Sequence, residues 1–309
     1  GANSYSGGTS VEAGVLEIAG DGQLGVASGS LTLADGGTLR LSASHLGSAR
    51  NINLLGSGGV IDVNGTQNGV FAGTISGVGA LALVNTGAYV PTEDLPITPS
   101  GSSNYSGGTR VGIEGVNGGR VNAQVTGSSS LGTGDVDIYL NSELMFRGAG
   151  ASAGGLTITT WESSNQLGTN SGTYFIDGAS AGTAHLLNQG KGSYTIFDGA
   201  GTSAGSAHID NNGGRVYFFA GSSGGSATIH NNAGGIVDAW AADLSGTTVH
   251  NNAGTVFISN SNSGVAIGSL GGAGNVVLGG RQLRLGSLGQ DGTIGGAISD
   301  PGVGYLGQL

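Results

Sequence analysis

Apolar and polar residues alternate in short runs along almost the whole chain, and glycine-rich segments separate the runs. An alternation of period two places successive side chains on opposite faces of an extended strand, so it predicts β-strands. No run of useful length repeats with the 3.6-residue period of an amphipathic helix. The pattern therefore predicts an all-β fold. Clear examples are Leu31/Leu33, Leu39/Leu41, Tyr174/Ile176 and Val256/Ile258.

The strands between residues 184 and 260 recur at a nearly constant interval. Two apolar series locked to one period indicate a single structural unit stacked along an axis, which is a solenoid. We therefore predict one solenoid over residues 1–309, with about 20 residues per rung. The first series begins at Ala184, Ala207, Ala227 and Thr247, and the second consists of Ile176, Ile196, Val216, Ile236 and Val256.

Asparagines recur at matching positions of this repeat: Asn211, Asn231 and Asn251, each followed by a second asparagine. Stacked asparagine side chains can hydrogen-bond to one another along a solenoid, so we interpret them as structural ladders.

A Gly-x-Ser-x-Gly motif also recurs once per rung, at Ser152, Ser180, Ser203 and Ser223. This motif can mark a catalytic serine on a strand–turn–helix. Its repetition and the absence of a following helix pattern favour a small-residue turn.

The sequence Tyr-Ser-Gly-Gly-Thr occurs twice, at Tyr5–Thr9 and at Tyr105–Thr109, and a Leu-Gly pair follows each copy. A lead-in of the form Gly-x-Ile-Ser begins at Gly73 and recurs imperfectly at Gly296. These blocks resemble the passenger-associated transport repeat of bacterial autotransporters. The resemblance is specific over residues 1–148 and 264–309. The residues between these two ranges have a sequence pattern like that of the family but lack its diagnostic motif.

The resemblance implies a right-handed parallel β-helix that is displayed on the bacterial cell surface, held at the outer membrane, or secreted. It also implies export through a C-terminal β-barrel of the full-length protein, a partner that these 309 residues do not contain. Both ends of the sequence fall within repeats, and no signal peptide is recognisable, so we expect a fragment of a longer chain. The function implied is an adhesive or stalk segment that also serves as a scaffold for export and folding.

The amino-acid composition excludes several classes of partner and site. The chain has 67 glycines, 9% charged residues, no cysteine and a formal net charge of −10. Nine basic residues in 309 cannot form a continuous phosphate-binding stripe, so nucleic acid is not an expected partner. The lack of cysteine excludes thiolate metal sites and cysteine nucleophiles. No apolar run is long enough to span a membrane as a helix.

Residues 88–103 interrupt the pattern and hold three of the four prolines. Because proline cannot donate a hydrogen bond to a sheet, we predict that this segment leaves the β-helix as a loop. The loop is either a tolerated surface insertion or a binding or capping loop, since repeat scaffolds often carry recognition on loops. Glu93, Asp94 and Leu95 are its candidate binding residues.

Large aromatic residues are few, so those on an outer face are candidate binding residues. Alternation places Phe218 on the core side and Tyr217 and Phe219 on the other side. Trp161, Tyr217 and Trp240 are the candidate exposed aromatics, and partial burial under a turn is the alternative. Exposed rings could stack on sugars or on another chain. The expected partner is therefore a host-surface or glycan ligand, or a second copy of the chain.

No catalytic, metal or cofactor site is predicted. His230 and His250 lie in register and could share a metal, but Asp210 occupies the matching position one rung earlier, and a structural or solvent-facing role is favoured. Asp135 and Asp137 share one side of a strand, as glycoside cleavage or calcium binding would require, although an exposed strand end explains them as well. Two alternatives stay open: a non-binding stem with an enzymatic domain upstream, and a polysaccharide-cleaving β-helix.

Overall fold

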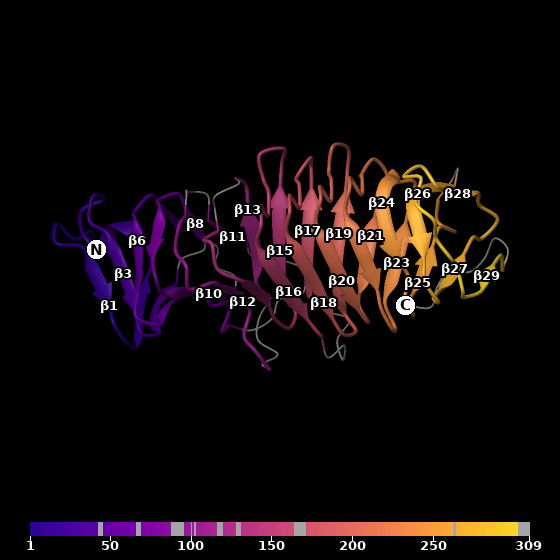
Figure 1. Ribbon diagram of the computed structural model, residues 1–309. Helices are drawn as coiled ribbons and strands as arrows, with labels where there is room; N and C mark the ends of the chain where they lie inside the picture. The colour runs from indigo at the N-terminus through magenta and orange to yellow at the C-terminus, as the bar shows by residue number, and fades with distance from the viewer. Residues whose placement is uncertain are drawn as a thin grey trace. The chain divides into compact units, whose positions relative to one another are not determined.

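Short parallel strands build the chain in the computed structural model (Figure 1). The structure describes residues 1–42, 46–65, 69–87, 96–99, 101, 103–115, 120–127, 131–163, 171–261 and 264–301. These residues fall into two compact units, Gly1–Phe146 and Arg147–Leu309. Each unit is a parallel β-solenoid, so the predicted all-β solenoid class is confirmed. The prediction of one continuous domain over residues 1–309 stays a prediction.

In the first unit, each strand pairs in parallel with the strand one turn further along the chain. One sheet contains β1 (Thr9–Val11), β3 (Leu31–Ala34), β6 (Ile52–Leu55) and β9 (Ile75–Gly77). A second contains β2 (Val15–Ile18), β4 (Gly37–Leu41), β7 (Gly58–Asp62), β10 (Ala80–Val84), β12 (Thr109–Val111) and β14 (Val136–Ile138). A third contains β5 (Leu46–Ser48), β8 (Gly69–Phe71), β11 (Pro96–Pro99), β13 (Asn122–Val125) and β15 (Glu143–Arg147).

The second unit has two ladders of parallel strands. The first ladder contains β16 (Thr157–Trp161), β18 (His185–Gln189), β20 (His208–Asn212), β22 (Thr228–Asn231), β24 (Leu244–His250), β26 (Val265–Gly271) and β28 (Leu283–Leu285). The second contains β17 (Ser171–Ile176), β19 (Ser193–Asp198), β21 (Arg215–Phe218), β23 (Ile236–Ala239), β25 (Thr255–Phe257), β27 (Asn275–Val277) and β29 (Ile298–Ser299). Among the described residues, the single helical segment is the 3-10 turn η1 (Asp21–Leu24).

No helix within the described residues is both long and apolar enough to cross a membrane.

The Tyr-Ser-Gly-Gly-Thr blocks pack closely against the next turn of the solenoid. Tyr105 is fully buried, and its hydroxyl lies 2.6 Å from the Thr109 hydroxyl. The Leu-Gly pair of the next turn supplies Gly132, where an added Cβ would lie only 2.1 Å from the Tyr105 carbonyl oxygen. Glycine is therefore required for this close approach. Tyr5 and Thr9 repeat the hydroxyl contact at 2.7 Å, so both motif copies use the same interaction.

The core of the second unit is a column of stacked side chains inside the solenoid. Phe175, Phe197 and Phe218 are fully buried, and their rings stack at centroid separations of 5.0 and 4.8 Å. Burying a phenylalanine contributes roughly 1.5–3 kcal/mol relative to leaving it exposed. The alternation predicted for residues 216–219 is correct, because Val216 and Phe218 are buried while Tyr217 and Phe219 are half-buried.

The asparagine ladder runs beside this core. The Asn211 side chain donates to Asn231 at 2.8 Å, and Asn231 donates to Asn251 at 2.9 Å. Each amide also donates to a backbone carbonyl of the neighbouring strand, so these buried polar groups are satisfied. A second ladder, Asn212, Asn232 and Asn252, is closed by bonds of 2.7 and 2.8 Å. The predicted structural role is confirmed.

The recurring serines form turns, as their spacing predicts. Ser152, Ser180, Ser203 and Ser223 pair with one another as a column of parallel bridges. Each hydroxyl accepts a hydrogen bond at 3.0 Å from the backbone N–H two residues later. That bond belongs to a tight local turn, which explains why the motif repeats once per rung.

The predicted rung length and one predicted series need correction. The average is about 22 residues per turn rather than 20, because the perfect 20-residue step applies only to part of the second unit. In the second ladder, Val216 pairs with Thr195 and Val237 rather than with Ile196 and Ile236. A slip of one residue moves a side chain to the opposite face, so Ile196 and Ile236 are half-buried while Val237 is buried.

The predicted loop over residues 88–103 is wrong for residues 96–99. These residues form β11, which pairs with β8 on one side and with β13 on the other. Pro96 and Pro99 stand at the two ends of the strand, so the N–H groups of Ile97 and Thr98 between them remain available to the sheet. Residues 88–95, including Glu93, Asp94 and Leu95, lie outside the described residues.

Candidate functional site

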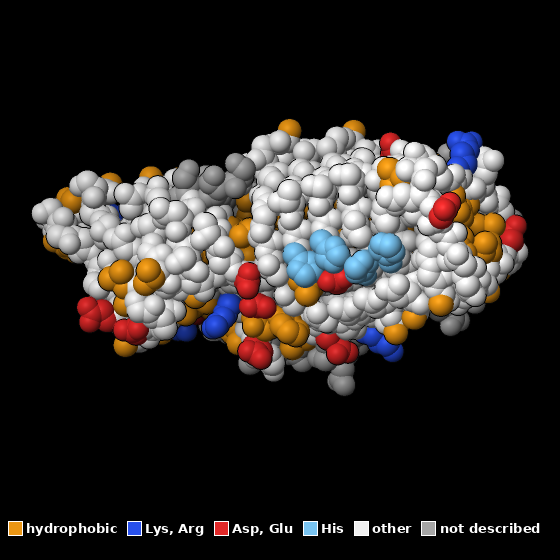
Figure 2. Space-filling model, viewed as in Figure 1, with side chains coloured by type: hydrophobic (Ala, Val, Ile, Leu, Met, Phe, Trp, Pro, Cys, Tyr) orange, Lys and Arg blue, Asp and Glu red, His pale blue; other side chains and the backbone are white. Residues whose placement is uncertain are grey.

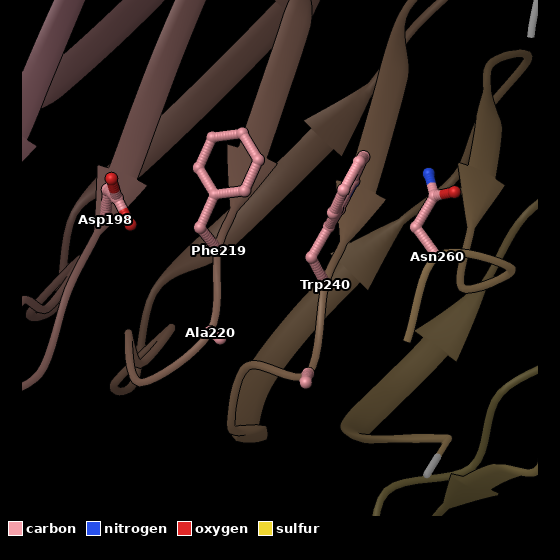
Figure 3. Close-up of a pocket in the computed structure, with 6 residues that line it drawn as sticks. Asp198, Phe219, Ala220, Trp240 and Asn260 are labelled. Carbon is pink, nitrogen blue, oxygen red and sulfur yellow. The ribbon is translucent and has the colours of Figure 1, made fainter. Parts of the chain in front are cut away.

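An open aromatic cleft lies where the strands of the second ladder end (Figure 3). Phe219 and Trp240 directly follow β21 and β23, and they stand at matching positions because Phe218 pairs with Ala239. The two ring centroids are 5.4 Å apart with the ring planes at 66°. Asp198 lies one rung before them and Asn260 one rung after. The cleft encloses about 320 Å³, and Ala220 and Ala241 complete its wall.

A buried carboxylate orients Trp240. Asp238 is only 9% exposed, and it accepts hydrogen bonds from the Trp240 side chain and from Asn260 Nδ2, the latter at 3.2 Å to both carboxylate oxygens. Burial raises the pKa of Asp238, although these hydrogen bonds and the nearby Arg215 oppose the rise. The indole is therefore held by its N–H while its ring faces the cleft, which is the arrangement of a pre-positioned binding surface.

The three candidate aromatics occupy different surroundings. Trp161 and Trp240 are 42% and 39% exposed, whereas Tyr217 is half-buried. The Tyr217 hydroxyl accepts a hydrogen bond of 2.9 Å from Arg215, and its ring stacks on Phe219 at 5.7 Å. Tyr217 thus packs against Phe219 without lining the cleft itself. Trp240 lines the cleft, whereas Trp161 lies on β16 and is not one of the lining residues.

A second, polar cleft lies in the first unit. It encloses about 340 Å³ and is lined by Asp135, Asp137, Arg110 and the glycines of the second Tyr-Ser-Gly-Gly-Thr block. Arg110 and Asp137 are register partners on β12 and β14. Asp135 is exposed and Asp137 half-buried. Glycoside cleavage uses a pair of carboxylates, and the predicted pair of Asp135 and Asp137 lines this cleft together with Arg110.

Histidines and one aspartate gather on the outer face of the first ladder of the second unit (Figure 2). His185 pairs with His208 across β18 and β20, while Asp210 pairs with His230 across β20 and β22. The predicted register of Asp210, His230 and His250 is correct. The first apolar series, which contains Ala184 and Ala207, also aligns His185 with His208, but the sequence did not single out His185 as a candidate ligand.

The Asp210 carboxylate is the centre of this group. Its Oδ2 lies 2.8 Å from His185 Nε2, and its Oδ1 lies 3.3 Å from both His208 Nε2 and His230 Nδ1. Burial acts to raise the pKa of Asp210, but the hydrogen bond from His185 and the charges of the nearby imidazoles outweigh it, so the pKa is lowered. The pKa of His230 is also lowered, first by burial and then by repulsion from His208.

Comparison with known proteins agrees with the fold. The chain is 32% identical over 127 residues to the adhesin BmaC, an autotransporter of Brucella suis biovar 1 (strain 1330). The aligned part is 41% of this chain and 4% of that adhesin, so the chain spans only a small part of its relative. No family model and no solved structure matches the chain. The similarity and the parallel β-solenoid together support the autotransporter passenger that the repeat motifs predict.

Proposed function

We propose that this chain is an adhesive segment of an autotransporter passenger at the bacterial surface or in secreted form, and that its aromatic cleft binds a carbohydrate. The observation that carries the proposal is the cleft lined by the rings of Phe219 and Trp240 and by the polar side chains of Asp198 and Asn260. Aromatic rings stack on the apolar faces of sugars, while carboxylate and amide groups hydrogen-bond their hydroxyls. The adhesin relative supports an adhesive, non-enzymatic role.

The surrounding solenoid suits this role. Asp238 fixes the indole, and Tyr217 supports Phe219, so few side chains need to be ordered when a ligand binds. Pre-organisation of this kind lowers the entropic cost of binding. Stacked rungs also hold the cleft on a rigid support, and each rung templates the next as the chain folds.

A glycan-binding assay with the purified 309-residue chain tests the proposal. The probe is a panel of immobilised neutral and acidic oligosaccharides. We expect binding that Trp240→Ala and Phe219→Ser each weaken about five- to twelvefold, since sugar stacking on one aromatic ring contributes on the order of 1–1.5 kcal/mol. Trp161→Ala is the matched control, because Trp161 is equally exposed but does not line the cleft.

Two results would overturn it. One is the absence of any glycan binding by the unaltered chain. The other is glycan binding that both cleft variants leave unchanged. If the cleft variants instead abolish self-association of the chain, the occupant is a second copy and the carbohydrate proposal fails.

The polar cleft supports a second candidate function, polysaccharide cleavage. Its observation is the placement of Asp135, Asp137 and Arg110 around one cavity. Incubation with acidic and neutral polysaccharides should then release new chain ends, and Asp137→Asn should abolish the release. If no chain ends are released from any substrate, polysaccharide cleavage is rejected and the adhesive role is the remaining proposal.

A further inference from the structure

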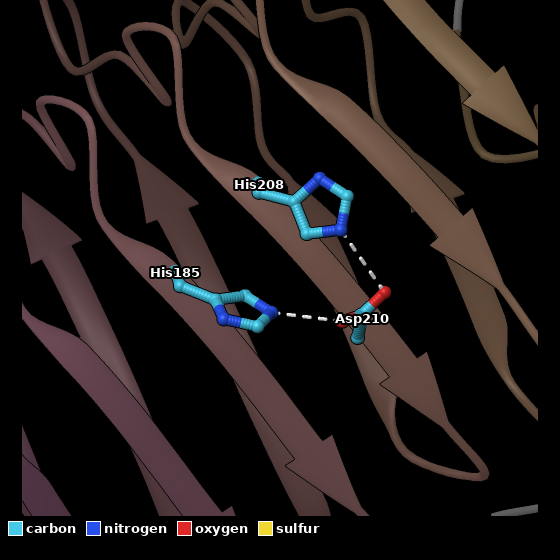
Figure 4. Close-up of side chains that lie close together, drawn as sticks. All are labelled: His185, His208 and Asp210. Carbon is cyan, nitrogen blue, oxygen red and sulfur yellow. Dashed lines mark hydrogen bonds and ion pairs between the residues drawn. The ribbon is translucent and has the colours of Figure 1, made fainter.

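We propose that His185, His208 and Asp210 form a binding site for a divalent transition-metal ion such as Zn²⁺, on the outer face of the second unit. Figure 4 shows both imidazoles directed at the same carboxylate from adjacent strands. One donor atom from each of the three side chains lies within 4.8 Å of the other two. The inference is independent of the aromatic cleft and of what that cleft binds.

The solenoid itself brings these ligands together. His208 and Asp210 are two residues apart on β20, so they share the outer face of one strand. His185 stands opposite His208 on β18, at the spacing of about 4.8 Å between neighbouring strands. All three positions are therefore fixed by backbone pairing, and only side-chain rotation is needed to bring the donor atoms to metal-bonding distance.

The donors select the class of metal. Two imidazole nitrogens and one carboxylate are a borderline set that suits Zn²⁺, Cu²⁺, Ni²⁺ and Co²⁺. Ca²⁺ and Mg²⁺ prefer oxygen ligands only, so they are poor candidates. His230 offers a further imidazole, because its Nδ1 lies 3.3 Å from Asp210 Oδ1.

The site is accessible from solvent. The side chains of His185 and His208 are 41% and 43% exposed, so an ion can enter without any rearrangement of the core. Three protein ligands leave one position of a tetrahedral ion for water or for another ligand. The formal charge of −10 on the chain favours the approach of cations.

The same positions on neighbouring rungs show that the cluster is local. In the column that contains His185 and His208, the neighbouring positions are Thr157 on β16 and Thr228 and Thr248 on β22 and β24. A bound ion would therefore connect two adjacent rungs, β18 and β20, at one point of the stack. We expect it to stabilise the second unit against unfolding.

Calorimetric titration of the untagged 309-residue chain with Zn²⁺ tests the site. We expect one ion per chain with micromolar affinity, and an affinity at least about tenfold weaker in His208→Gln and in Asp210→Asn. His250→Gln is the matched control. This residue is exposed and its ring lies 5.0 Å from His230, but it is outside the three-ligand group, so its loss should leave the affinity unchanged.

Two further readouts follow the ion itself. Zn²⁺ should raise the unfolding midpoint reported by tryptophan fluorescence in the unaltered chain but not in Asp210→Asn. Co²⁺ should give the visible absorption of a four-coordinate ion, and His185→Gln should remove it. The proposal is overturned if millimolar Zn²⁺ produces no binding, or if the affinity survives loss of His208 and Asp210. An equal loss in His250→Gln would also overturn it, because the histidine row rather than the cluster would then bind the metal.

Discussion

Removal of one rung of the buried asparagine ladder should destabilise the second unit strongly. The Asn231 amide accepts a hydrogen bond from Asn211 at 2.8 Å and donates to Asn251 at 2.9 Å and to the Thr255 carbonyl at 3.2 Å. Each such bond contributes about 0.5–1.5 kcal/mol net, and a buried partner left without a donor costs more. Asn231→Ala should therefore lower the free energy of unfolding by about 2–4 kcal/mol.

The outer ladder provides the control. Asn232 also makes two ladder bonds, donating to Asn212 at 2.7 Å and accepting from Asn252 at 2.8 Å, but it is only half-buried. Water can replace these bonds, so Asn232→Ala should cost less than about 1 kcal/mol. Both variants remove an asparagine from a ladder, but Asn231 is buried and also donates to the Thr255 carbonyl, so the difference between them reports burial together with that one further bond.

Urea denaturation followed by tryptophan fluorescence measures both variants. The two tryptophans, Trp161 and Trp240, belong to the second unit, so the signal reports the unit that carries the ladder. With a urea dependence of about 2 kcal/mol per molar, Asn231→Ala should shift the midpoint down by about 1–2 M. Equal midpoints for Asn231→Ala and Asn232→Ala would contradict this prediction, since burial of the ladder would then make no difference to stability.

Three further substitutions test other parts of the structure. Burial raises the pKa of Asp238, so ionisation of this carboxyl group opposes folding increasingly as the pH rises above its ordinary value of 3.8. Asp238→Asn should therefore be more stable than the unaltered chain at pH 7 and equally stable below pH 3.8. Urea titrations at both pH values measure the difference. Gly132→Ala should destabilise the first unit by at least about 2 kcal/mol through the clash with Tyr105, measured by circular dichroism, whereas Gly47→Ala, with no atom within 4 Å of the new Cβ, should be tolerated. Phe218→Ala should cost about 3–5 kcal/mol by the same fluorescence assay, and a smaller loss would show that the stacked core collapses around the gap.

The fold was largely readable from the sequence because its repeat is nearly regular. Asn211, Asn231 and Asn251 differ by a constant 20 residues, and their hydrogen bonds follow that step without exception. The second apolar series failed because the rungs of β19, β21 and β23 do not keep the step, and a one-residue slip reverses the buried face. The prolines of β11 led to the wrong prediction of a loop at residues 96–99, because a sheet tolerates proline at the ends of a strand.

The candidate site was only partly readable. Phe219 could be assigned to the outer face by alternation, but the cleft that it shares with Trp240 depends on strand ends that carry no sequence signal. Asp238 is a polar residue in an apolar strand, and only the structure shows that it accepts the indole N–H. His185 was missed as a ligand although the series that contains Ala184 and Ala207 aligns it with His208, because the 23-residue step separates it from the histidines that follow the 20-residue repeat.

Attachment of bacteria that display the chain is the most direct test of the adhesive role. Cells displaying residues 1–309 and cells displaying the Trp240→Ala variant would be matched for surface level and scored on glycan-coated and uncoated surfaces. We expect the unaltered chain to mediate attachment to the coated surface, Trp240→Ala to lose it, and Trp161→Ala to behave as the unaltered chain. Equal attachment by all three, or attachment no greater than that of cells without the chain, would contradict the proposed adhesive role.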